Sequence, residues 1–132
     1  MIASREYVKD LITKVLKKFN TYSTDEKLIG FWIDGKPLYR KILTGTTTGS
    51  VDSYYSLSGI NYDIITNIKV LVNTPDYVVD LSTYSNTGQN GVLIEKSQNR
   101  LRISNNNYAF YNSPVIIILE YTKKGIIKYD SK

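Results

Sequence analysis

The chain has 132 residues, a length that suits one domain, and its formal net charge is +5. It contains no cysteine and no histidine, which excludes disulfides, thiolate and imidazole metal sites, Ser-His-Asp triads and Cys-His dyads. No apolar run approaches the roughly 18 to 20 residues needed to span a bilayer, so no membrane insertion is expected.

The positive charge is concentrated at the two ends of the chain. Residues 1–20 hold five basic residues against two acidic ones, residues 123–132 hold four against one, and the residues between are close to neutral. A nucleic-acid-binding domain more often spreads its basic side chains over a folded face. The charge distribution therefore favours other functions.

The first predicted element is an amphipathic helix over residues 4–20. Apolar residues recur there at helical spacing and form one stripe, which consists of Val8, Leu11, Ile12, Val15, Leu16 and Phe19. Part of this stripe also has the spacing of a coiled-coil seam, but about two heptads are too short to be stable alone. We expect this N-terminal segment, residues 1–21, to pack on its own domain, on copies of itself or on another protein, as an anchor or oligomerisation element.

Residues 22–43 are predicted to form a β-hairpin. Residues 28–33 are apolar on both alternating faces, so we expect a sheet to cover each face of the hairpin. The dipeptide Asp34-Gly35 favours a two-residue type I′ turn, in which both central residues need positive φ. Gly30 is expected to allow a close approach between neighbouring strands.

The hairpin also carries a sequence motif. Tyr22 to Glu26 (YSTDE), Trp32 to Lys41 (WIDGKPLYRK) and Leu119 to Lys123 (LEYTK) resemble the opening and closing segments of a small β-rich module of bacteriophage tail, fibre and head-fibre proteins. This resemblance implies a structural virion protein, a short head or tail fibre on the surface of the phage particle, made in the host cytoplasm. Since such fibres are usually homotrimers, it also implies self-association.

Short strands separated by polar turns are predicted along the rest of the chain. They cover residues 51–57, 65–73, 77–84, 92–96, 100–104 and 115–119, and residues 125–132 either add an edge strand or trail free. This spacing predicts a mainly β fold, an antiparallel β-sandwich over residues 22–132 preceded by one N-terminal amphipathic α-helix.

The predicted strand over residues 115–119 (VIIIL) is apolar at five consecutive positions. An antiparallel strand with one solvated face should instead alternate apolar and polar residues. One face can line the sandwich core. The other face, with Ile116 and Ile118, should meet either the N-terminal helix or a neighbouring subunit.

Tyrosine and asparagine are frequent beside the predicted loops over residues 45–58, 84–91 and 105–108. Tyrosine offers stacking area with a polar end, and amide side chains offer paired donors and acceptors, which suits glycan recognition. Tyrosine also favours strands and asparagine favours turns, so a structural role is the alternative for each residue. The candidate ligand residues are Tyr54, Tyr55, Tyr84, Asn86, Gln89, Asn90, Asn106 and Tyr108.

No residue pattern indicates catalysis, because the 12 acidic residues form no spaced cluster. We therefore expect a non-enzyme without catalytic residues, cofactor or metal. The main interpretation is a phage fibre whose helix contacts capsid or tail proteins and whose loops contact a host surface glycan. The alternatives are a stand-alone carbohydrate-binding module and a nucleic-acid-binding protein that uses Lys96, Arg100 and Arg102.

Overall fold

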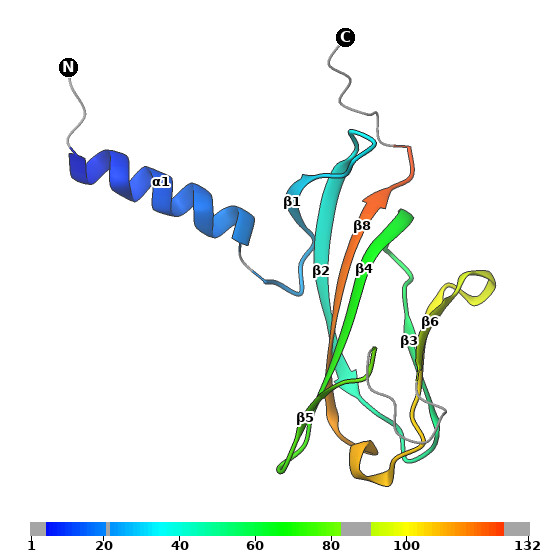
Figure 1. The fold of residues 1–132 in the computed structure, drawn as a ribbon. Coiled ribbons are helices and arrows are strands. Elements are labelled where there is room, and N and C mark those ends of the chain that lie inside the picture. The colour runs from blue at the N-terminus through cyan, green and yellow to red at the C-terminus, as the bar shows by residue number, and fades with distance from the viewer. Residues whose placement is uncertain (1–4, 21, 83–90, 126–132) are drawn as a thin grey trace.

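The computed structural model describes residues 5–20, 22–82 and 91–125, and within the helix it describes the side chains of residues 5–14. The helices and strands follow one another in the order shown in Figure 1. They are α1 (Arg5–Asn20), β1 (Lys27–Phe31), β2 (Pro37–Thr46), β3 (Asp52–Ser56), β4 (Tyr62–Asn73), β5 (Val78–Asp80), β6 (Gly91–Glu95), η1 (Lys96–Gln98), β7 (Arg100–Ser104), η2 (Tyr108–Phe110) and β8 (Pro114–Lys123).

The described strands form two antiparallel sheets that pack against each other (Figure 1). The five-stranded sheet has the order β1-β2-β8-β4-β5, and the three-stranded sheet has the order β3-β7-β6. β8 is the last described strand, yet it lies in the middle of the larger sheet and pairs with β2 on one side and β4 on the other. The predicted antiparallel sandwich with one N-terminal helix is confirmed.

The hydrophobic core lies between the two sheets. Alternate residues of β8 face it, and the same period of two holds on β4 and β7. The fully or almost fully buried core residues on these strands are Val70, Val72, Leu101, Ile103, Val115, Ile117, Leu119 and Tyr121. The alternation of the sequence predicts Val70, Val72, Leu101 and Ile103 as inward residues and one face of residues 115–119 as part of the core, and the structure confirms this.

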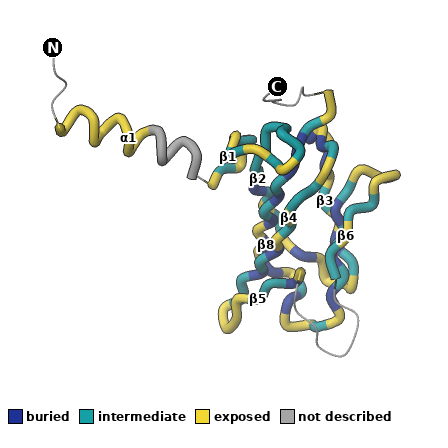
Figure 2. Tube along the Cα trace, turned by 45° about the horizontal axis from the view of Figure 1, so that its top comes forward, coloured by how far each residue is buried: buried dark blue, intermediate teal, exposed yellow. Residues whose placement is uncertain are grey.

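α1 does not cover the sandwich. Figures 1 and 2 show it projecting away from the sheets, and residues 5–14 are all exposed. Val8, Leu11 and Ile12 leave 43, 51 and 54% of their surface accessible. The alternative in which the helix packs on its own domain, over the outer face of β8, is therefore not what the structure shows.

The turn between β1 and β2 differs from its prediction. The N–H of Gly35 donates to the carbonyl of Trp32 at 2.9 Å, and the N–H of Trp32 donates to the carbonyl of Lys36 at 2.8 Å. Gly35 has φ +85°, whereas Asp34 is not in the left-handed region. The connection is therefore a three-residue loop and not a type I′ turn. The Asp34 carboxylate accepts from the N–H of Lys36 at 3.0 Å, which stabilises this loop.

The position of the hairpin is a second correction. β1 is the outermost strand of its sheet, and Ile33 at the tip of the hairpin is 90% exposed. The hairpin is therefore not covered by a sheet on both of its faces. Gly30 lies at a register shift between β1 and β2 with φ +155°, and no atom is within 4 Å of the position that its Cβ would take. Its role is a β-bulge and not a close approach between strands.

Further differences concern loops and ends. The predicted loop over residues 45–58 contains the end of β2, whereas β3 confirms the strand that is predicted within it over residues 51–57. Asn105, predicted at an exposed tip, is buried, and its amide oxygen accepts from the N–H of Asn107 at 3.1 Å. β5 has only three residues. The predicted edge strand falls mostly on residues 126–132, which lie outside the described residues.

At Gly45 the backbone lies close to the ring of Tyr55. A Cβ added there would lie 2.8 Å from Cε1 of Tyr55, whose hydroxyl donates to the carbonyl of Thr46 at 3.0 Å. Because this bond holds the ring, we expect Gly45→Ala to lower the free energy of unfolding by about 1 to 3 kcal/mol. Chemical denaturation measures the change.

The matched control is Gly91→Ala, since no atom lies within 4 Å of a Cβ built at Gly91. We expect this substitution to change the free energy of unfolding by less than about 0.5 kcal/mol. Equal effects of the two substitutions would show that the Tyr55 ring does not restrict position 45.

Candidate functional site

The structure does not gather the predicted ligand residues that it describes at one place. Tyr54 and Tyr55 lie on β3, while Asn106 and Tyr108 lie before and within η2. The remaining predictions lie outside the described residues, namely Tyr84, Asn86, Gln89 and Asn90. The described candidates therefore fall into two separate groups.

The described tyrosine candidates differ in how far neighbouring groups cover them. The Tyr55 ring packs on the core, and burial raises the pKa of its hydroxyl. Tyr54 is partly covered, because the guanidinium of Arg100 lies 4.0 Å from its ring centroid. Tyr108 is 85% exposed and forms an edge-to-face pair with Tyr111 at 5.4 Å. Of the described tyrosine candidates, Tyr108 is the one most open to a ligand.

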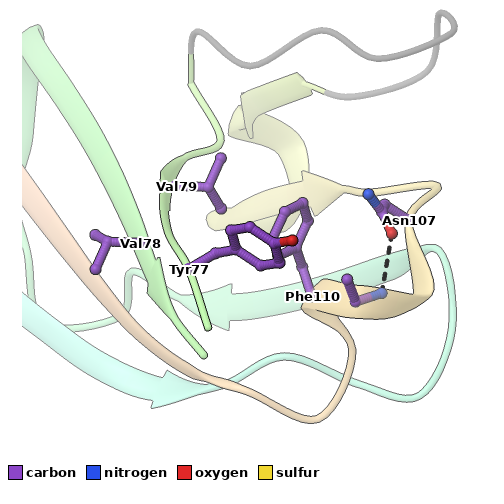
Figure 3. A pocket seen from close by; sticks show the side chains of 6 residues that line it. Tyr77, Val78, Val79, Asn107 and Phe110 are labelled. Carbon is purple, nitrogen blue, oxygen red and sulfur yellow. Dashed lines mark hydrogen bonds between the residues drawn. The ribbon is translucent and has the colours of Figure 1, made fainter. Parts of the chain in front are cut away.

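A groove of about 550 Å³ lies beside this tyrosine, between β5 and η2 (Figure 3). Tyr77, which is 61% exposed, meets Phe110 edge to face with the ring centroids 6.5 Å apart. Asn107 lies at the other side of the groove, and its amide oxygen accepts from the N–H of Ala109 at 2.9 Å. An exposed aromatic ring beside an amide group suits the apolar face and the hydroxyls of a sugar.

Sequence reasoning missed this groove. The alternation over residues 77–84 predicts that Tyr77, Val79 and Leu81 share one face of a strand, but Tyr77 is exposed whereas Val79 and Leu81 pack on the core. The reason is that β5 begins at Val78, so Tyr77 belongs to the turn after β4. The turn signal at residues 73–76 was present in the sequence, but its contact with η2 depends on the folded chain.

A second surface lies on the outer face of the five-stranded sheet. Ile116, which is 36% exposed, and Ile118 face outward on β8. They line an apolar groove of about 360 Å³ together with Ile42, Leu71 and the segment over residues 22–24. The predicted anchor residues Ile116 and Ile118 are therefore accessible, at least in part.

The other predicted anchor residues lie on α1. Val8, Leu11 and Ile12 are exposed, while the side chains of Val15, Leu16 and Phe19 lie outside the described part of the helix. Because α1 projects away from the sandwich, the structure does not bring its stripe together with the outer face of β8 (Figure 1). The chain thus presents two separate apolar surfaces.

The three motif segments meet in one cluster. The Glu26 carboxylate accepts from the hydroxyl of Tyr121 at 2.7 Å and from the ammonium of Lys123 at 2.8 Å. The Tyr121 ring stacks on Tyr39 with the centroids 6.4 Å apart, and the Lys123 ammonium lies 5.0 Å from the Tyr39 ring centroid. This cluster joins β2, β8 and the segment that leads into β1.

A neighbouring contact involves the same segments. The Arg40 guanidinium lies 3.8 Å from the centroid of the Tyr22 ring and 3.5 Å, from Nη1 to Oε2, from Glu120. These interactions tie the chain after α1 to β2 and β8. Several side chains of the motif thus connect parts of the fold, which gives the motif a structural role.

The electrostatics of the cluster follow from this geometry. Burial works against the Glu26 charge, but the hydrogen bonds from Lys123 and Tyr121 outweigh it, so the pKa of Glu26 is lowered. The pKa of Tyr121 is strongly raised, first by burial and then by its hydrogen bond to Glu26. The cluster therefore keeps a carboxylate charged and a phenol neutral near neutral pH.

Other kinds of site have little support. Within residues 5–20, 22–82 and 91–125, no group of three or more metal-ligating side chains is close enough to hold an ion, and no helix is long and apolar enough to cross a bilayer. The predicted basic patch is largely compensated, because Arg100 pairs with Glu95 at 3.2 Å and Arg102 with Asp52 at 3.1 Å. This pairing weakens the nucleic-acid alternative.

The fold places the chain in a broad class, the antiparallel β-sandwich proteins, here with a helix in front. A scan against protein-family models found no match, and neither did searches of curated proteins and of solved structures.

The motif cluster generates a prediction about pH. Glu26→Gln should lower the free energy of unfolding by about 1 to 2 kcal/mol at pH 7, because the carboxylate loses its charged hydrogen bonds and is only partly shielded from water. A lowered pKa in the folded state means that this stability is present above the unfolded pKa and is lost as the pH falls.

Denaturation of the wild type and the variant across pH measures the effect. The difference between the two should shrink below about pH 4, where the carboxylate of the unfolded chain protonates. Asp76→Asn, at an exposed position in the β4–β5 turn, is the matched control and should be neutral. A difference that does not depend on pH would contradict the role of the Glu26 charge.

Proposed function

We propose that the protein is a structural component of a bacteriophage virion, a short head or tail fibre that is held together and anchored through α1. The observation that carries this proposal is the exposed apolar stripe of α1, represented by Val8, Leu11 and Ile12. Residues 5–14 of the helix project away from the sandwich, so its own domain does not bury the described part of this stripe (Figure 2).

The energetics favour a partner for this helix. An isolated helix of about this length is marginal in water, because nucleation is costly and short helices recover little of that cost. Burying an aliphatic side chain contributes about 1.5 to 3 kcal/mol, so a few such residues on each helix add up to a stable bundle. Copies of α1 that pack side by side would supply this burial.

A homotrimer is the assembly that we favour. In a closed symmetric assembly each copy presents the same surface, and every helix buries its stripe against its neighbours. The outer groove at Ile116 and Ile118 offers a second apolar surface for contacts between the sandwich domains or with a capsid or tail protein. α1 and this groove are the proposed anchor and oligomer surfaces.

The link to a virion rests on the motif resemblance. The segments that carry it supply Glu26, Tyr39, Tyr121 and Lys123, which form one cluster. A motif that builds such a cluster is a signature of a fold, so its presence supports membership of the same structural class. The proposed location is therefore the surface of a phage particle.

A second candidate function is carbohydrate binding, either by the fibre or by a stand-alone module. The groove at Tyr77 and Phe110 favours it, because it pairs an exposed aromatic ring with the Asn107 side chain. In a fibre, this groove would contact a glycan of the host surface.

The role of α1 can be tested with a double variant. Val8→Ser with Ile12→Ser removes the centre of the described stripe, so we expect the trimer to dissociate to a monomer of 15.1 kDa in sedimentation velocity. In phage that carry the variant gene, mass spectrometry of purified particles should find at least about ten-fold less of this chain, since lost burial weakens anchoring.

The matched control is Asp10→Ser with Lys14→Ser, which changes exposed residues outside the surface that Val8 and Ile12 line and should leave both readouts intact. A wild-type chain that sediments as a monomer would contradict the trimer. Purified particles that never contain the wild-type chain would contradict the virion location.

The carbohydrate function has its own test. Tyr77→Ala should lower binding to a glycan array by about ten-fold, because the ring provides the stacking surface, whereas Tyr77→Phe should retain binding. The ring is largely exposed, so the fold should persist in both variants. Tyr7→Ala, at an exposed position on α1 outside the groove, is the control, and a wild-type protein that binds no glycan would exclude this function.

A further inference from the structure

A second pocket lies at the opposite end of the sandwich from the Tyr77 groove, where β4 begins and β8 ends. Tyr62 pairs with Lys123 at this end of the two strands, whereas Val72 pairs with Val115 at the other end. The pocket has a volume of about 440 Å³. Its polar lining consists of Asn61, Tyr62, Asp63, Lys96, Asn99 and Lys124, from three segments of the chain.

Backbone hydrogen bonds hold these three segments in place. The N–H of Lys124 donates to the carbonyl of Asn61 at 3.0 Å. The N–H of Asn99 donates to the carbonyl of Lys96 at 3.2 Å, and the carbonyl of Asn99 accepts from the N–H of Leu57 at 2.9 Å. The polar side chains of the pocket thus stand on a backbone that is already fixed, which lowers the entropic cost of binding a ligand.

The charge of the pocket is positive. Asp63 is the one carboxylate in its described lining, and Lys36 already pairs with it, Nζ to Oδ2, at 2.5 Å. Among the residues that the structure describes, neither Lys96 nor Lys124 forms an ion pair. Within the described part of the chain, the pocket therefore carries two ammonium groups that no carboxylate contacts as an ion pair.

Both lysines line the pocket, and their charges act on Asp63. The pKa of Asp63 is lowered, first by the hydrogen bond from Lys36, against a smaller opposing effect of burial, and further by the charges of Lys36, Lys124 and Lys96. The carboxylate nearest to Lys96 along the chain, Glu95, is engaged by Arg100 at 3.2 Å.

We propose that this pocket binds an anionic group, a phosphate or a carboxylate, carried on a hydroxylated ligand such as a sugar or a polyol. Lys96 and Lys124 supply the positive charge, and ammonium groups bind phosphate and carboxylate oxygens as point charges. Asn61 and Asn99 supply amide donors and acceptors for hydroxyl groups. This site does not depend on the virion proposal and differs from the Tyr77 groove in place and in ligand chemistry.

Titration of the ¹⁵N-labelled full chain with small probes tests the site. Glycerol 3-phosphate and glucuronate represent the two anions, and glycerol and methyl glucoside are their uncharged counterparts. We expect saturable shifts of the Asn61, Asn99 and Lys124 amide signals with at least one anionic probe, with a Kd of about 1 mM or below, and none with the uncharged probes. The anionic probe that binds shows whether the site takes a phosphate or a carboxylate.

Charge-removing variants give the second arm. Lys96→Gln and Lys124→Gln should each weaken binding by about five- to ten-fold, and higher salt should weaken binding in the wild type. Both side chains are exposed, so the variants should fold. Lys69→Gln, an exposed lysine on β4 outside the pocket, is the matched control and should bind like the wild type.

Three results would overturn the proposal. The first is the absence of saturable shifts with either anionic probe. The second is unchanged binding when Lys96→Gln and Lys124→Gln are combined, or equal weakening by Lys69→Gln. The third is that inorganic phosphate binds as tightly as glycerol 3-phosphate. The hydroxyl groups of the ligand would then contribute nothing to its binding.

Discussion

One partly buried carboxylate, that of Glu26, connects the parts of the larger sheet. It lies before the edge strand β1 and accepts hydrogen bonds from residues 95 and 97 positions further along the chain. A partly buried charge is favourable only when it has hydrogen-bond and ion-pair partners. Tyr121 and Lys123 on the central strand β8 provide these partners. The interaction therefore forms only when the chain brings the segment before β1 next to β8.

The central position of β8 has consequences for both faces of its sheet. One face of the strand is sealed in the core, where Ile117 and Leu119 are fully buried. The other face stays open at Ile116, because neither the three-stranded sheet nor α1 covers it. A strand that is apolar on both sides thus gives the fold its stability on one side and an unburied surface on the other.

The possible functions of the chain are spread over surfaces that differ in chemistry. α1 and the outer groove are apolar, which suits contacts with other protein chains. The groove at Tyr77 combines aromatic and amide groups, and the pocket at Lys96 and Lys124 is polar and positively charged. The last two lie at opposite ends of the β4–β8 pair, so a fibre would present them to different surroundings (Figure 1).

The strands themselves could be predicted well from the sequence. β7 begins and ends where the alternation of apolar and basic residues placed it, at Arg100–Ser104, and the predicted β6 is shifted by one residue. The amphipathic helix was equally visible, as α1 over Arg5–Asn20. These features depend on apolar residues that recur every two to four positions, so a short segment of the sequence is enough to predict them.

Only the tertiary structure decided which surfaces remain open and which charges meet. The position of β8 between β2 and β4, the exposure of Tyr77 and the convergence of Lys96 and Lys124 near Asp63 all depend on residues far apart in the chain. Local patterns specify that a strand is apolar on both faces, but they do not specify what covers each face. That choice belongs to long-range pairing, whose free energy depends on the whole chain at once.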